Sequence, residues 1–182
     1  QALKSPYFGF VQGHTHLHPE TLEQIKQLVG LQKADVVANY ESRFAKLVGQ
    51  GQAIAYASAR MGFYDLMQLL GIGKGNEVIL LGSTCAVMVN AVMRTGAKPV
   101  FADIDGDTFG SSSLTIAACV TQHTRIIVAQ HSFGIPCDIE PIVKLAKEKN
   151  IFLIVTSLHL TNLKKKFLIK ILIYIIKALM LL

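Results

Sequence analysis

Residues 78–102 read VILLGSTCAVMVNAVMRTGAKPVFA and show most clearly how this chain is organised. The apolar run Val78–Leu81 is followed by a segment of helical pattern and then by a second apolar run, Val100–Ala102. Continuous apolar runs this short are typical of strands that are buried on both faces, and Gly96 marks the end of the helix between them. A strand, a crossover helix and a second strand form a parallel pair.

The same alternation continues on both sides of this stretch. Three further apolar runs predict strands, namely Ala53–Ala57, Ile126–Ala129 and Ile151–Val155. Three segments each place one set of side chains on a single helical face: Phe63, Leu66, Met67 and Leu70; Ala86, Val89, Asn90 and Met93; and Ile139, Ile142, Val143 and Ala146. Strands joined by crossover helices form a mainly parallel sheet that helices cover on both faces. The sequence therefore predicts a three-layer α/β/α fold, with residues 51–157 as its domain.

The two flanking segments differ from this domain in composition. Residues 1–50 carry two expected helices, one from Pro19 to about Val29 and one from Tyr40 to Val48, which ends on Gly49 as a C-cap. Residues 158–182 consist mainly of Leu, Ile and Lys and contain no Gly, Pro, Asp or Glu. Because this change comes without a linker, we expect an aberrant tail, translated from an A/T-rich stretch in the wrong frame, after a truncated domain.

The charge and the cysteines exclude several classes of function. Because the rest of the chain is nearly balanced, the net charge of +6 does not indicate a nucleic-acid partner. Much of the excess comes from Lys164, Lys165, Lys166, Lys170 and Lys177. Cys85, Cys119 and Cys137 are widely spaced, which indicates neither a disulfide framework nor a zinc site and favours a reducing cytoplasm.

A candidate phosphate site lies at residues 57–62, ASARMG, between an expected strand and an expected helix. The unpaired N–H groups of a helix N-terminus bind anions at such a junction. Small residues let the backbone approach a phosphate closely, and Ser58 can cap the helix or donate a hydrogen bond. The alternative is a serine N-cap with no ligand.

Two alternating patterns contain residue types that bind metals. They are His14, His16 and His18, and Asp103, Asp105 and Asp107. Three imidazoles on one face of a strand would suit zinc, but no acidic or histidine partner follows at a matching spacing, so we expect a solvated loop. The aspartates lack the Gly and the terminal Glu of a calcium loop, and we expect them in a polar loop that leaves a strand. No metal site is predicted.

Six short segments, in order, carry a family resemblance. They are residues 41–45 (ESRFA), 58–61 (SARM), 71–79 (GIGKGNEVI), 96–101 (GAKPVF), 103–105 (DID) and 131–138 (HSFGIPCD). Over roughly residues 19 to 155 the chain resembles the DegT/DnrJ/StrS family of aminotransferases, which depend on pyridoxal 5'-phosphate (PLP) and are best known for aminating nucleotide-linked keto-sugars. The resemblance implies the large domain of a fold type I PLP-dependent transferase and a homodimer with active sites at the subunit interface.

The resemblance also assigns residues to the cofactor. Ser58, Ala59 and Arg60 match the Ser-Gly-Thr-like turn that holds the cofactor phosphate. Ala59 replaces the usual Gly, whereas Arg60, where Thr is common, adds a cation that can pair with the phosphate. Thr84 and Cys85 match the position of the residue that packs on the pyridine ring, and an ordinary buried thiol is the alternative for Cys85.

Two parts of the family's chemistry are not matched. After the strand that corresponds to Ile151–Val155 the family has Glu-Asp, and this Asp pairs with the pyridine nitrogen. Thr156 and Ser157 stand here instead, and neither carries a charge. The Schiff-base lysine belongs to a later segment, and no lysine of the tail lies in a matching context, so no catalytic residue is assigned.

Three functions follow as alternatives. In the first, the parent protein is a cytoplasmic PLP-dependent aminotransferase that passes an amino group, with glutamate as donor, to a nucleotide-linked keto-sugar. In the second, the chain is a catalytically inactive, truncated α/β module with at most weak phosphate binding. The third is a membrane-attached protein that uses its tail, although the apolar stretch 167–182 is shorter than the roughly twenty residues of a spanning helix.

Overall fold

A computed structural model of the chain describes residues 19–27, 33–48, 52–132 and 135–157. The chain divides into two compact units, Gln1–Asn39 and Tyr40–Leu182. The first contains helix α1 (Pro19–Gln27) and the start of helix α2 (Lys33–Val48). The helix expected from Pro19 is confirmed, and the helix expected from Tyr40 forms the second half of α2. Gly49, expected as its C-cap, lies outside the described residues.

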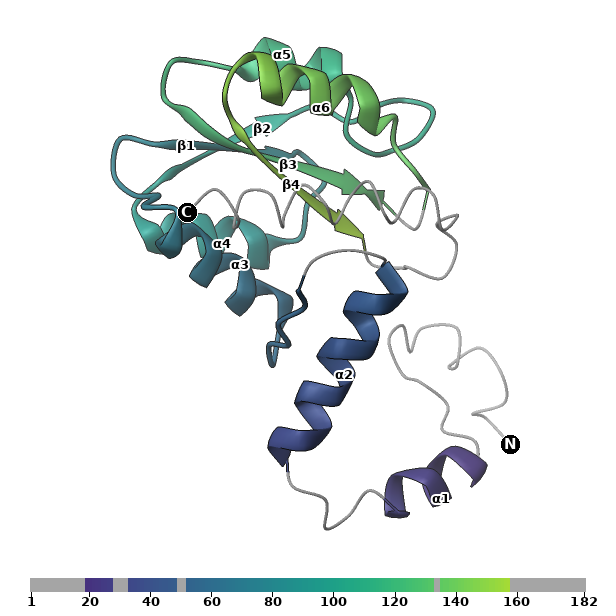
Figure 1. Ribbon diagram of the computed structural model, residues 1–182. Coiled ribbons are helices and arrows are strands. Elements are labelled where there is room, and N and C mark those ends of the chain that lie inside the picture. The colour runs from purple at the N-terminus through teal and green to yellow at the C-terminus, as the bar shows by residue number, and fades with distance from the viewer. Residues whose placement is uncertain (1–18, 28–32, 49–51, 133–134, 158–182) are drawn as a thin grey trace, which may run out of the picture. The chain divides into compact units, whose positions relative to one another are not determined.

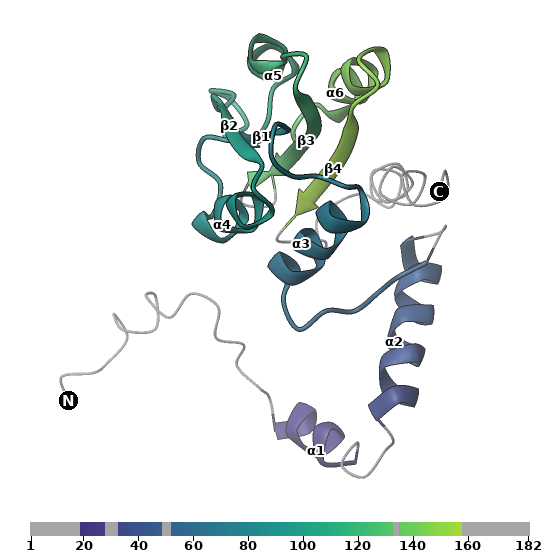
Figure 2. The same ribbon diagram turned by 90° about the vertical axis from the view of Figure 1, so that its left-hand side faces the viewer.

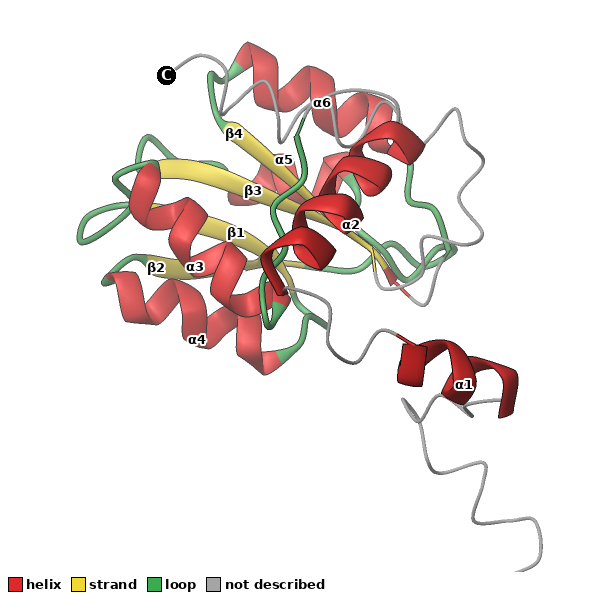
Figure 3. Ribbon diagram, turned by 60° about the horizontal axis from the view of Figure 1, so that its bottom comes forward, coloured by secondary structure: helices red, strands yellow, loops and turns green. Residues whose placement is uncertain are grey.

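The second unit is built on a four-stranded parallel sheet (Figure 3). Its strands are β1 (Glu77–Leu81), β2 (Lys98–Ala102), β3 (Thr124–His131) and β4 (Phe152–Ser157), in the order β2-β1-β3-β4. Ile79 of β1 pairs with Val100 of β2, and Ala129 of β3 pairs with Val155 of β4. The predicted parallel sheet is confirmed. Strands β1, β2 and β3 each contain one predicted apolar run, and β4 contains the predicted run Ile151–Val155 except for Ile151.

Helices cover both faces of this sheet (Figures 1 and 2). One face carries α3 (Ala59–Leu69) and α4 (Ala86–Thr95), and the other carries α5 (Ser113–Cys119) and α6 (Ile139–Glu148). Because successive side chains of a strand point to opposite faces, β1 contributes side chains to the core on both sides of the sheet. Val78 and Leu80 pack with Phe63 of α3, whereas Ile79 packs with Ile142 of α6. The predicted three-layer α/β/α architecture is confirmed.

The strand predicted at Ala53–Ala57 is wrong, because residues 52–57 have no regular secondary structure. Small side chains dominate this run, and Ile54 is 66% exposed, so the run buries little apolar surface. The backbone N–H of Ala55 donates to Oε1 of Glu41 at 2.6 Å rather than to a neighbouring strand. The segment is an extended connection that leads into α3.

The buried face predicted for α4 is also wrong, except at Val89, which is partly buried against the core. Ala86 and Asn90 are exposed, and Met93 is 60% exposed. The residues that α4 buries are Ala91 and Val92. This helix is apolar almost all round its circumference, so its sequence fits several faces equally well. By contrast, the faces predicted for α3 and α6 are the ones that pack on the sheet.

One connection between elements agrees with the sequence prediction and another does not. Gly96 ends α4 in the left-handed conformation, with φ of 85°, which confirms it as the C-cap. The short helix α5 follows the aspartate loop and is not anticipated by the sequence pattern.

Candidate functional site

Helices α3 and α4 both begin at the carboxyl edge of the sheet. The strands are parallel, so α4, which follows β1, starts where that strand ends. Residues 70–76 join the end of α3 to the start of β1 at the opposite edge, so the first turn of α3 also lies at the carboxyl edge. Ligands of open α/β sheets bind at this edge, where helix N-termini present unpaired N–H groups.

The predicted phosphate turn forms the N-terminus of α3. Ser58 is the N-cap, with extended backbone (φ −153°, ψ 147°), and its carbonyl accepts from the N–H of Met61 at 3.0 Å. Its hydroxyl makes no capping hydrogen bond, so the first turn keeps N–H groups for an anion. Ala59 is exposed and is the first residue of the helix. A helical backbone conformation does not require glycine. This turn therefore fits the phosphate end of a PLP molecule.

The second predicted pair, Thr84 and Cys85, lies at the N-terminus of α4. Cys85 is the N-cap, and its side chain makes no capping hydrogen bond. The thiol is exposed, so the alternative of an ordinary buried thiol is wrong. The Thr84 hydroxyl donates to Oε1 of Gln130 at 2.9 Å. The loop between β1 and α4 is thus tied to the neighbouring strand β3.

Gln130 is the residue at this edge that the sequence analysis missed. Its amide nitrogen donates to Oγ of Ser132 at 3.4 Å, and its backbone N–H donates to Oγ of Ser111 at 2.9 Å. With the bond from Thr84, Gln130 joins the loops that follow β1, β2 and β3. The available signal was its position, since it is the first polar residue after the apolar run Ile126–Ala129 of a central strand.

The residues after Gln130 fix the loop that leaves β3. His131 is fully buried, and its Nδ1 accepts from the N–H of Cys137 at 3.0 Å. Burial lowers the pKa of His131, so the imidazole is neutral at neutral pH. Burial likewise raises the pKa of the Cys137 thiol to about 11, which leaves it unreactive. Both residues therefore have a structural role in supporting the carboxyl edge of the sheet.

The end of β4 brings no carboxylate to this edge. Thr156 pairs in register with Gln130, and Ser157 pairs with His131. Thr156 is half-buried, and its hydroxyl cannot supply a negative charge. The described residues therefore fit the phosphate end of PLP and provide no acidic partner for its ring nitrogen at this strand.

The aspartate pattern forms the polar loop expected after β2. The carboxylate of Asp105 accepts from the N–H groups of Asp107 and Thr108, at 3.2 and 2.9 Å, and from the Thr108 hydroxyl at 3.0 Å. These bonds, chiefly those from Thr108, lower the pKa of Asp105. Nowhere in the described part of the chain do three His, Cys, Asp or Glu side chains gather as a metal site. His14, His16 and His18 lie outside the described residues.

A second polar cluster lies at the opposite, amino edge of the sheet. The buried carboxylate of Glu77 accepts from the Thr121 hydroxyl and from Lys98 Nζ, the latter at 3.0 Å. The hydrogen bond from Thr121, followed by the one from Lys98, lowers the pKa of Glu77. Because these bonds join Glu77 of β1 to Lys98 of β2 and to Thr121, the cluster supports the start of both strands.

Within the described ranges no helix has the length and apolar character needed to cross a membrane. The tail on which the membrane alternative depends, residues 158–182, lies outside these ranges. That alternative therefore stays a prediction.

Comparison with known proteins places these features in one group of enzymes. The model of the DegT/DnrJ/EryC1/StrS aminotransferase family matches residues 17–159. The spore coat polysaccharide biosynthesis protein SpsC of Bacillus subtilis (strain 168) is 32% identical over an alignment of 160 residues, and the match covers 82% of this chain and 41% of the relative. GDP-perosamine synthase of Escherichia coli O157:H7 is 35% identical over 122 residues, which are 67% of this chain and 34% of the relative.

A solved structure supports the same grouping. The aminotransferase from Psychrobacter cryohalolentis superposes with a TM-score of 0.69 at 29% identity, over 79% of this chain and 37% of that chain. The chain therefore spans between about a third and two-fifths of the length of these three proteins.

Proposed function

Because this chain belongs to the DegT/DnrJ/EryC1/StrS aminotransferase family, we propose that it forms the cofactor-binding part of an aminotransferase. The family is PLP-dependent. The observation that carries the proposal is the pair of helix N-termini, of α3 and α4, that open at one edge of a parallel sheet without side-chain caps. Such an edge is where an anionic cofactor binds in this class of fold.

The proposal extends to the substrates and the setting of the enzyme. One curated relative is named for polysaccharide biosynthesis, and another is named for the synthesis of GDP-perosamine, a nucleotide-linked sugar. We therefore propose a nucleotide-linked keto-sugar as the acceptor and glutamate as the donor of the amino group. A cytoplasmic homodimer is part of the same proposal.

Each predicted site residue has a defined part in this proposal. The N–H groups of the first turn of α3 and the Ser58 hydroxyl hold the cofactor phosphate, and Arg60 adds a positive charge beside Ala59. Thr84 and Cys85 lie against the ring, and Gln130 holds the Thr84 hydroxyl in place at 2.9 Å. When bound, PLP supplies the electron sink that lets an amino group pass from donor to acceptor. No described side chain is assigned to proton transfer.

A second candidate function is a binding module without turnover. It is favoured by Thr156 and Ser157, which leave the end of β4 without a carboxylate beside the proposed ring position. In that case the Ser58 turn would bind phosphate weakly, and the chain would not convert substrate.

The proposal is tested by the affinity of the full chain for PLP, measured by equilibrium dialysis. We expect saturable binding with one PLP per chain and an increase in the Kd of several-fold in Ser58→Ala, since a hydroxyl bond to a dianion is lost. Ser112→Ala is the matched control, because Ser112 is the N-cap of α5 on the other face and its side chain accepts from the N–H of Leu114.

The control variant separates a site effect from a stability effect. Ser112→Ala should lose about 1 kcal/mol of stability and keep the wild-type affinity for PLP. A wild-type chain that does not bind PLP would contradict the proposal. Binding without release of 2-oxoglutarate from glutamate would favour the module without turnover.

A further inference from the structure

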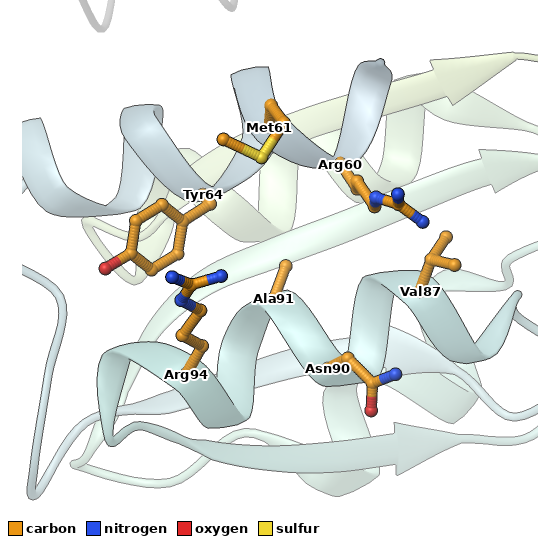
Figure 4. Close-up of a pocket in the computed structure, with 7 residues that line it drawn as sticks. All are labelled: Arg60, Met61, Tyr64, Val87, Asn90, Ala91 and Arg94. Atoms are coloured by element: carbon orange, nitrogen blue, oxygen red, sulfur yellow. The ribbon is translucent and has the colours of Figure 1, made fainter.

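A groove of about 330 Å³ lies between α3 and α4, on the outer side of the layer that they form (Figure 4). Its lining residues come from both helices. They are Arg60, Met61 and Tyr64 of α3 and Val87, Asn90, Ala91 and Arg94 of α4. Ligand pockets of proteins occupy about 300–1,000 Å³, so the groove is large enough for a small molecule.

The charge of the groove has a single sign. Arg60 and Arg94 are its two charged residues, and no lining residue is acidic. Neither arginine forms an ion pair with another described residue. Each guanidinium therefore keeps N–H donors for an external anion, in the planar arrangement that matches phosphate oxygens.

Arg94 is held in position within the groove. Its guanidinium carbon lies 5.3 Å from the centre of the Tyr64 ring, which is a cation–π contact between the two helices. The ring covers one face of the guanidinium, while the N–H groups at its edge stay available. A cation that is already ordered loses less conformational freedom when a ligand binds.

Arg60 lies four residues before Tyr64, so both project from the same side of α3. Figure 4 shows Arg60 extending toward Val87 and Arg94 extending toward Tyr64, with Ala91 between the two arginines. Met61, Val87 and Ala91 provide apolar walls. The groove thus combines two cations with a surface for an apolar group.

We propose that the groove between α3 and α4 binds a phosphate-bearing small molecule, with Arg60 and Arg94 as its ligands. A phosphate group offers several oxygens to donors from both helices and accepts bidentate bonds from arginine. The groove shares Arg60 with the proposed cofactor turn, whereas Arg94 lies in the last turn of α4, away from the helix N-termini. Arg94 is therefore the residue that distinguishes the groove from the turn at Ser58. Binding in the groove extends beyond the proposed aminotransferase function.

The test is calorimetric titration of inorganic pyrophosphate into the full chain. We expect saturable binding in the wild type and a Kd about tenfold higher or more in Arg94→Gln and in Arg60→Gln, because each loses a charge-assisted bond. Arg94→Lys keeps the charge without the fork of donors and should lie between the wild type and Arg94→Gln. Arg43→Gln is the matched control, since Arg43 is an exposed arginine on α2.

The outcomes separate this site from the cofactor turn. Loss of affinity in both groove variants, with wild-type affinity in Arg43→Gln and in Ser58→Ala, supports the proposal. Absence of binding, or an equal loss in Arg43→Gln, overturns it. Binding that Ser58→Ala abolishes and PLP displaces assigns the anion to the cofactor turn and also overturns it. Arg94→Gln should leave the affinity for PLP unchanged, so a failure here is distinct from a failure of the aminotransferase proposal.

Discussion

Gly110 stands where the fold leaves no room for a side chain. A Cβ atom at this residue would lie 2.9 Å from the backbone oxygen of Gln130 and 3.1 Å from Cβ of Cys137. The first contact is closer than real Cβ atoms tolerate, and both neighbours are held firmly. The Gln130 carbonyl accepts from the N–H of Ser111, and Cys137 is buried in the core. Gly110→Ala must therefore shift the backbone at the carboxyl edge.

The expected cost follows from this clash. Overpacking by a methyl group in a closely packed region costs about 1–3 kcal/mol, and we expect Gly110→Ala to lower the free energy of unfolding by this amount. Gly106 is the matched control, since it lies in the same loop and a Cβ there would meet no atom within 4 Å. Gly106→Ala should be neutral or gain up to about 1 kcal/mol, because it restricts the unfolded chain.

Urea denaturation of the wild type and both variants measures the difference. The free energy of unfolding is taken at unchanged m-value, so that the unfolded states remain comparable. Equal stability of Gly110→Ala and Gly106→Ala would refute the close approach of residue 110 to β3.

Burial of His131 predicts a pH-dependent stability. Because its pKa is lowered from 6.5, the unfolded chain binds a proton that the folded chain does not, so stability is complete above about pH 6.5 and falls below it. Urea midpoints measured between about pH 5.5 and about pH 8 should show this loss of stability at low pH. The variant His131→Gln should flatten the pH dependence, whereas the control His123→Gln, at an exposed histidine, should keep it. A wild-type stability that does not change with pH would contradict the prediction. The thiols should differ toward a disulfide reagent, with exposed Cys85 reacting first and Cys137, whose pKa is raised to about 11, reacting only on unfolding. Cys85→Ser should remove the fastest phase, and its persistence would disprove the exposure of Cys85.

Strand positions in this protein could be predicted because burial on both faces leaves a local signature. Val78–Leu81 and Ile126–Ala129 are continuous apolar runs, and both lie in strands of the sheet. Ala53–Ala57 has a similar pattern and forms no strand, because its side chains are mostly small and exposed and the run buries little apolar surface. An apolar run shows what can be buried, and its neighbours determine whether it is.

The candidate site was predictable in part for a related reason. The turn at Ser58 is a local feature, since a short polar residue directly before a helical segment indicates the N-cap position wherever the helix lies. Gln130 has no such local signal, because its importance comes from Thr84, which is 46 positions away in the sequence. The groove with Arg60 and Arg94 likewise depends on how two helices pack.

Apolar runs, helix boundaries and the phosphate turn were set by interactions between residues close in the chain, so the α/β class, the family and Ser58 could be identified from the residues in order. The buried face of α4, the network around Gln130 and the pairing of Arg94 with Tyr64 depend on contacts across the fold. An almost uniformly apolar helix such as α4 has no preferred face until a sheet lies beside it. The physical reason is that burial and cross-chain hydrogen bonds are properties of neighbours in space, and chain order does not specify them.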